Sequence, residues 1–138
     1  MEKIDLVNQL MGVSSMLYDS GDYAESISKL VEAWNILPED KYQYKESYHI
    51  IQRILSTAIM SKDYETMMQY LPHIFKASPG RPDYGGREFW AGRVYYEMGD
   101  MEKSYQFFQV AYKKSNRKCF DFEDEKYLKF FLTYKLRF

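Results

Sequence analysis

Three short turn signals recur along the chain at nearly even spacing, and they constrain the fold more than any other feature. They are Gly21-Asp22-Tyr23, Lys62-Asp63-Tyr64 and Gly99-Asp100-Met101, whose aspartates lie 41 and 37 residues apart. Similar residue types recur four, eight and eleven residues after each aspartate, and nine and five residues before it. Both sets of offsets follow one face of a helix with about 3.6 residues per turn. Each segment therefore predicts a helix, a tight turn and a second helix.

The residues at these turns have separate roles. A glycine at the end of a helix accepts a positive φ, and the aspartate that follows can cap the next helix. A proline stands sixteen residues after the first two aspartates, at Pro38 and Pro79, where it should end the second helix. Before the first turn, the buried helix face is expected to include Val13 and Leu17.

The pattern resembles the tetratricopeptide repeat, a helix-turn-helix unit of about 34 residues. The matching residues are Gly21-Asp22-Tyr23-Ala24-Glu25-Ser26 with Leu30, Ala33 and Pro38, and Gly92, Tyr95, Gly99-Asp100, Phe108 and Ala111. The resemblance covers residues 7 to 116 and implies an all-α, right-handed superhelical solenoid. Its three repeats would span about 7–40, 41–81 and 85–118, in a single domain covering residues 1–138. An unrelated helical bundle stays open as the alternative.

The sequence departs from the repeat pattern at four positions. They are Ser14 and Leu55 at a position that is usually a small glycine, Lys62 at a turn glycine and Glu88 at a large apolar position. The second repeat is therefore the weakest match.

Two insertions and a C-terminal segment lie outside the repeat pattern. The residues from Lys41 to Ser47 contain good helix formers, so they are expected to add two turns to the third helix. The Gly- and Pro-rich stretch Pro79 to Gly86 predicts a loop. A capping helix is expected over about 122–136, because the last repeat of a solenoid exposes an apolar flank. The residues expected to cover the third repeat are Tyr127, Leu128, Phe131 and Leu132.

No combination of residues in the chain predicts catalysis, a cofactor or a metal site. His49 and His73 are too far apart in sequence to form a helical metal-ligand pair. Cys119 has no neighbouring histidine or aspartate to complete a nucleophile system, and a single cysteine cannot form an internal disulfide. We therefore expect a protein that is not an enzyme.

Charge and hydropathy exclude further classes. Nineteen basic and twenty acidic side chains give a net charge of -1, which argues against a nucleic-acid-binding protein. No uncharged run is long or apolar enough to span a bilayer, and the acidic N-terminus is unlike a signal peptide. The sequence thus predicts a cytoplasmic protein with no membrane partner.

Aromatic residues make up 18% of the chain, and some of them do not fit readily into packing between the helices of a repeat. In the tetratricopeptide family the first helix of each pair lines a concave groove, and the resemblance carries that role to particular positions. Aromatic and arginine side chains are typical of interface hot spots, which draws attention to the third repeat. The candidate partner-binding residues are Asn8, Met11, Ser15, Tyr18, His49, Gln52, Arg53, Ser56, Phe89, Trp90, Arg93, Tyr96 and Glu97.

These features predict a non-enzymatic module that holds another protein or peptide in its groove. The stretch from Arg117 to Asp124, with the Lys126-Tyr127-Leu128 that follows, is similar to the ends of small bacterial repeat proteins thought to neutralise secreted toxins. That resemblance implies an immunity protein that binds a cognate toxin. The alternatives are a generic adaptor and a secretion chaperone that bind peptide segments. Exposed aromatic residues at a solenoid end would also permit a homodimer.

Overall fold

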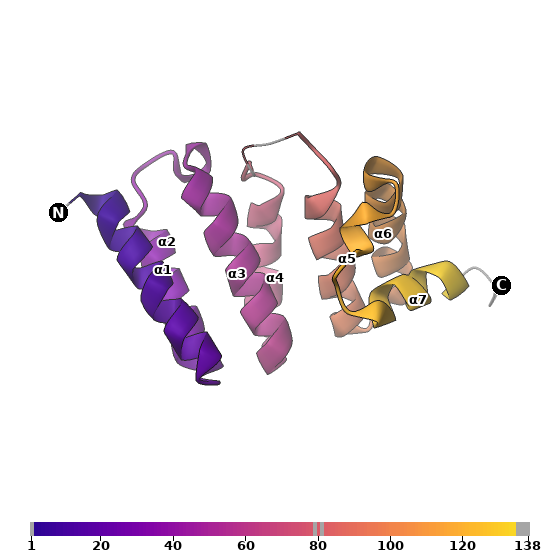
Figure 1. Cartoon of the computed structure of the whole chain (residues 1–138), viewed down its shortest axis with the longest axis horizontal. Helices are drawn as coiled ribbons and strands as arrows, with labels where there is room; N and C mark the ends of the chain where they lie inside the picture. Colours follow the sequence, from indigo (N-terminus) through magenta and orange to yellow (C-terminus); the bar gives the residue numbers. More distant parts are fainter. Residues whose placement is uncertain (1, 79, 81, 135–138) are drawn as a thin grey trace. The chain divides into compact units, whose positions relative to one another are not determined.

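A computed structural model describes residues 2–78, 80 and 82–134 of the chain. These residues form seven α-helices and two short 3-10 helices, with no β-strand among them, which confirms the all-α prediction (Figure 1). The α-helices are α1 (Lys3–Asp19), α2 (Tyr23–Ile36), α3 (Lys45–Ser61), α4 (Tyr64–Ile74), α5 (Gly86–Met98), α6 (Met101–Ser115) and α7 (Glu125–Tyr134). The 3-10 helices are η1 (Lys41–Gln43) and η2 (Lys118–Phe120). None of the described helices combines the length and the apolar character that crossing a membrane requires.

The chain divides into two compact units, which are described separately. Unit 1 is Met1–Arg81 and unit 2 is Pro82–Phe138. Unit 1 consists of two helical hairpins, α1 with α2 and α3 with α4, and α2 also packs against α3. Within this unit α1 and α3 lie on the near side in Figure 1, with α2 and α4 behind them. Its fully buried apolar side chains are Val7, Leu30, Ala33, Ile50, Ile51, Ile54, Leu55, Ala58, Met67, Ile74 and Ala77.

The three predicted turns have the predicted geometry. Gly21 and Gly99 adopt φ of 84° and 87°, and Lys62 adopts 57° at the same place in the second turn. The side chains of Asp22, Asp63 and Asp100 each accept a hydrogen bond from a backbone N–H three residues later, at 3.3, 3.2 and 3.2 Å. Pro38 follows the end of α2, whereas Pro79 lies outside the described residues.

One buried polar contact recurs in the first and third hairpins at the same register. The Ser26 and Ser14 hydroxyls lie 2.8 Å apart, and the Ser26 hydroxyl also donates to the Ser14 carbonyl at 2.8 Å. Ser104 likewise donates to the Gly92 carbonyl at 2.7 Å. The second hairpin has two buried apolar residues at the corresponding positions, Leu55 and Met67.

The expected buried face of the first helix is wrong at Val13, whereas Leu17 is half-buried. Val13 is 42% exposed, while Ser14 beside it is fully buried. The hydrogen bonds from Ser14 to Ser26 hold that side of α1 against α2, and Val7 lies on the same buried face. Val13 therefore points away from the α2 contact.

The first insertion does not lengthen the third helix by two turns, which corrects the expectation for Lys41 to Ser47. Asp40 adopts a left-handed φ of 63°, residues 41–43 form η1, and Tyr44 is extended before α3 begins at Lys45. The Lys41 Nζ donates to the carbonyls of Trp34 and Leu37 at 2.8 and 3.0 Å. These contacts with the end of α2 outweigh the helix propensity of the segment.

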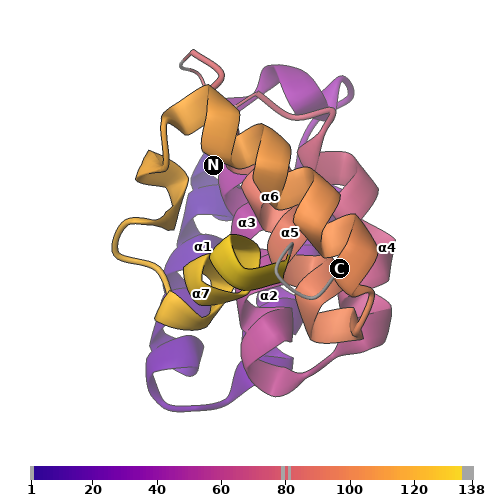
Figure 2. The same ribbon diagram turned by 90° about the vertical axis from the view of Figure 1, so that its right-hand side faces the viewer.

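Unit 2 consists of the α5–α6 hairpin with η2 and α7 packed against it. One buried cluster of the unit is almost entirely aromatic, and α7 runs obliquely across the hairpin (Figure 2). The Phe108 ring packs directly against Gly92, so a Cβ at that position would collide with the ring. The buried residues of this cluster are Phe89, Phe108, Ala111, Phe120, Tyr127 and Phe130. Ala91 and Val94 of α5 are fully buried as well. The expected loop before α5 is confirmed for the described residues 80 and 82–85.

The C-terminal helix is shorter than the expected range of 122–136. It begins at Glu125, because Phe122 adopts a positive φ of 65° and interrupts a helix there. Residues 135 and 136 lie outside the described part of the chain. Tyr127 and Phe130 are its buried residues, while Leu132 is 50% exposed and does not cover the hairpin as expected.

Candidate functional site

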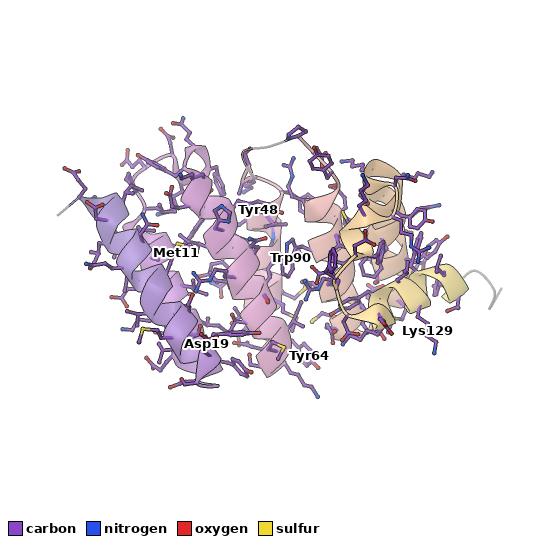
Figure 3. All side chains as sticks on the ribbon, viewed as in Figure 1. Met11, Asp19, Tyr48, Tyr64, Trp90 and Lys129 are labelled. Carbon is purple, nitrogen blue, oxygen red and sulfur yellow. The ribbon has the colours of Figure 1, made fainter. Side chains whose placement is uncertain are left out.

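An open pocket lies on unit 1 between α1, α2 and α3. Its volume is about 290 Å³. It is lined by Ser15, Tyr18, Asp19, Ser26, Arg53, Ser56 and Thr57. Figure 3 shows Met11 and Asp19 on α1, with Asp19 at the C-terminal end of that helix. Four of the residues predicted from the sequence, Ser15, Tyr18, Arg53 and Ser56, therefore lie around one cavity.

Arg53 is the central cation of this pocket. Its Nη2 donates to the backbone carbonyl of Met11 at 2.9 Å and to the Ser15 hydroxyl at 2.7 Å, which joins α3 to α1. Burial lowers the pKa of the Arg53 guanidinium below its usual value, but an arginine stays charged at neutral pH. Both hydrogen bonds to described residues come from Nη2, so Nε and Nη1 can donate to a bound group.

Some polar groups of the pocket already form hydrogen bonds within the fold, and others do not. The Thr57 hydroxyl donates to the Arg53 carbonyl at 2.7 Å, and the Ser26 hydroxyl is bound to Ser14. Neither the Asp19 carboxylate nor the Ser56 hydroxyl has a hydrogen bond to another described residue. The pocket thus offers a guanidinium donor, a carboxylate acceptor and a hydroxyl, the mixture that pairs with the alternating N–H and C=O groups of a peptide backbone.

The other predicted residues of unit 1 lie outside the pocket lining. Asn8 and His49 are exposed, and Gln52 lies 3.5 Å from the His49 ring nitrogen Nδ1. Met11 takes part only through its carbonyl, which accepts from Arg53. Sequence reasoning missed Ser26 and Thr57, which also line the cavity. The repeat pattern assigned Ser26 to the packed face of its helix and gave Thr57 no role.

The predicted residues of the third repeat pack largely within unit 2. Phe89 is only 4% exposed and contacts Phe108, Phe120 and Tyr127, so the prediction that it contacts a partner is corrected. The Tyr96 ring packs edge-on against Tyr127. The side of α5 that was predicted to face a groove is thus covered by the chain's own C-terminal helix, because α7 brings aromatic rings to it.

One further residue of α5, Glu97, binds α7 through its carboxylate. The Glu97 carboxylate accepts a hydrogen bond from the Tyr127 hydroxyl at 2.7 Å and forms an ion pair with Lys126 at 2.8 Å. Burial, and then the hydrogen bond to Glu97, raise the pKa of Tyr127 well above its usual value. These contacts fix α7 on the hairpin at its N-terminal turn.

Arg93 and Trp90 form a stacked pair on α5. The Arg93 guanidinium carbon lies 4.3 Å from the Trp90 ring centroid, and its Nη1 lies 3.5 Å from the Glu123 carboxylate. The Arg93 Nε is buried and has no hydrogen-bond partner among the described residues. Arg93 therefore joins α5 to the segment before α7.

The unexpected acid on α5 also has an internal partner. Glu88 is 8% exposed and its carboxylate lies 3.0 Å from the Lys114 Nζ, which also contacts Asp83 at 2.6 Å. The hydrogen bond from Lys114 is the main reason that the pKa of Asp83 is lowered. This ion pair explains why an acid can stand at a repeat position that is usually apolar.

The described side chains include no group of three or more His, Cys, Asp or Glu residues that could hold a metal ion. In comparisons with known proteins, no family model, no curated protein and no solved structure matches the chain.

Proposed function

We propose that this chain is a non-enzymatic protein that binds a segment of another polypeptide at the pocket of unit 1. The observation that carries the proposal is the gathering of Ser15, Tyr18, Arg53 and Ser56 around one cavity. All four are among the residues that the repeat pattern of the sequence predicts for partner binding. We also propose that the helical hairpins follow the tetratricopeptide solenoid arrangement, which the recurring turns and the recurring serine contact support.

Binding in this pocket would use hydrogen bonds more than apolar burial. Arg53 would donate to a backbone carbonyl or a carboxylate of the bound segment, while Asp19 would accept from a backbone N–H or a lysine. The Tyr18 ring, which packs against Tyr23 at a centroid distance of 5.2 Å, gives one wall an apolar surface. A segment bound in this way would be extended, because only an extended chain presents its N–H and C=O groups to a groove.

The proposal is tested by filling the pocket. The partner is first isolated from native lysate with the tagged full chain, identified, and purified; its dissociation constant is then measured by calorimetry. Ser56→Trp keeps Arg53 and fills the cavity, and we expect at least a tenfold loss of affinity. Arg53→Met removes the donor groups and should weaken binding similarly. Gln69→Ala, on the exposed surface of α4, is the control. Unchanged affinity in both pocket variants would place the binding site elsewhere.

The resemblance of the C-terminal stretch to immunity proteins makes a toxin the first partner to test. In that case a neighbouring gene should encode the toxin, and co-expression of this chain should restore growth of cells that produce it. The Ser56→Trp variant should fail to restore growth while remaining folded. An adaptor would instead bind several unrelated peptides, and a secretion chaperone would bind one exported client.

A further inference from the structure

The turn between η2 and α7 holds an aromatic side chain in a conformation that aromatic residues rarely adopt. The N–H of Glu123 donates to the carbonyl of Phe120 at 3.3 Å, and Asp121 has φ -66° and ψ 135°. Phe122 follows with φ 65°. These values describe a type II turn whose second central position needs a positive φ and usually carries glycine or asparagine. A bulky residue at such a position is a conformational outlier.

The same side chain is completely exposed. The relative accessibility of Phe122 is 107%, the highest among the large apolar residues that the structure describes. Local packing therefore gives no reason for an aromatic ring at this position, and local backbone geometry disfavours it. The Phe122 side chain makes the backbone conformation less favourable and does not stabilise the fold by packing. This combination indicates that the side chain contacts something other than this chain.

The turn is held rigidly on both sides. Phe120, two residues before Phe122, is 5% exposed and packs against Phe89 and Phe108. Tyr127, five residues after Phe122, is 1% exposed. Arg93 contacts Glu123 at 3.5 Å within the same turn. The ring is thus presented from a fixed backbone, which reduces the entropy lost when it is bound.

The charges beside the ring indicate what kind of surface it fits. Asp121, Glu123, Asp124 and Glu125 surround it in sequence, and the basic residue that follows, Lys126, is paired with Glu97. Asp121 and Glu125 have no ion pair with another described residue. A partner surface that accepts the ring would therefore need an apolar pocket with lysine or arginine side chains at its rim.

We propose that Phe122 is a binding anchor that inserts into an apolar pocket with a basic rim on a partner protein. This surface belongs to unit 2 and does not depend on the pocket of unit 1. It also gives a role to the exposed aromatic residue that neither the core nor the Arg53 pocket uses.

The first experiment uses the full chain with the photo-crosslinker p-benzoylphenylalanine at position 122. Irradiation in native lysate should give one main product, and peptide mapping should place the crosslink in an apolar depression flanked by basic residues of the other protein. The matched control carries the crosslinker at position 68, because Met68 is also exposed and does not line the pocket of unit 1. A product no stronger than at position 68, a crosslink to a second copy of this chain, or a crosslink to a site without basic residues would each overturn the proposal.

The second experiment separates binding from folding. Phe122→Gly removes the ring and also relieves the positive φ, so we expect the thermal unfolding midpoint to stay the same or rise. The affinity for the crosslinked partner should fall at least tenfold, and Asp121→Asn should reduce the salt dependence of binding. A lower unfolding midpoint for Phe122→Gly, or an affinity within twofold of the original, would show that Phe122 is not an anchor.

Discussion

The hydroxyl of Tyr42 lies 2.5 Å from the Nδ1 of His73, so the insertion between the first two hairpins is bound to the end of α4. The two rings also stack, with their planes inclined by 22°. When the neutral imidazole carries its hydrogen on Nε2, its Nδ1 accepts the Tyr42 hydrogen, whereas Nδ1 of a protonated ring can only donate.

This contact predicts a specific dependence of stability on pH. Burial, and then the charge of Lys76, lower the pKa of His73 below its usual value of 6.5. Between the folded and unfolded pKa values the unfolded state binds more protons, so the free energy of unfolding should fall as the pH decreases through this range. His73→Gln keeps an acceptor for Tyr42 but does not titrate, and urea unfolding at several values from about pH 7.5 to about pH 5 should show a smaller decrease.

The control for this series is His49→Gln, because His49 lies on the surface of α3. It should follow the pH dependence of the original chain. If His73→Gln and the original chain lose stability in parallel, the contact with Tyr42 does not control the response.

Two glycines in helices should respond in opposite ways to the same substitution. Gly92→Ala places a Cβ against the Phe108 ring, so we expect a loss of about 1–3 kcal/mol in the free energy of unfolding. Gly12→Ala meets nothing within 4 Å and should gain about 0.5–1 kcal/mol, because alanine favours the helix. Urea unfolding measured by circular dichroism tests both, and equal effects would contradict the packing at Gly92.

The hydrogen bond between α7 and α5 predicts the effect of removing one oxygen atom. Tyr127→Phe leaves the ring in the core but removes the donor to Glu97, and we expect a loss of about 1–2 kcal/mol. Tyr84→Phe is the control, since Tyr84 is 53% exposed and should change the stability by less than about 0.5 kcal/mol. If Tyr127→Phe lowers the free energy of unfolding as little as Tyr84→Phe does, the hydrogen bond contributes no net stability.

The buried acid of α5 should depend on its lysine. Lys114→Met leaves the Glu88 carboxylate largely buried without its partner, and we expect a loss of about 1–3 kcal/mol in chemical unfolding. Lys113→Met, at the exposed neighbouring position, should change little. The double variant Lys114→Met with Glu88→Leu should recover most of the loss, because no unpaired charge then remains. Failure to recover would assign the loss to Lys114 and Asp83 instead.

The sequence predicted the helical hairpins well because the signals for them are local. The turns at Gly21, Lys62 and Gly99 depend only on a few neighbouring residues, and even the lysine adopted the glycine conformation. Contacts between distant segments could not be predicted in the same way. Lys41 binds carbonyls at the end of α2, and this contact replaced the two helical turns that the propensity of its segment suggested.

The predictions for the candidate site show the same difference between local patterns and contacts with distant segments. In unit 1 Arg53 and Ser56, which the family resemblance carried over as binding positions, lie beside one cavity. In unit 2 the same resemblance led to a wrong conclusion for Phe89, since it could not show that α7 covers α5. A pattern within one helix says which residues share a face, but it does not say which later segment packs against that face.

The position of α7 also limits how this chain can grow by duplication. A copy of the third hairpin inserted after α6 would separate α7 from Glu97 and leave Tyr127 and Phe130 without the rings they pack against. Gene duplication could therefore add repeats before α5 more easily than after α6, and longer homologous arrays are expected to keep this last hairpin and its helix together as one inherited block.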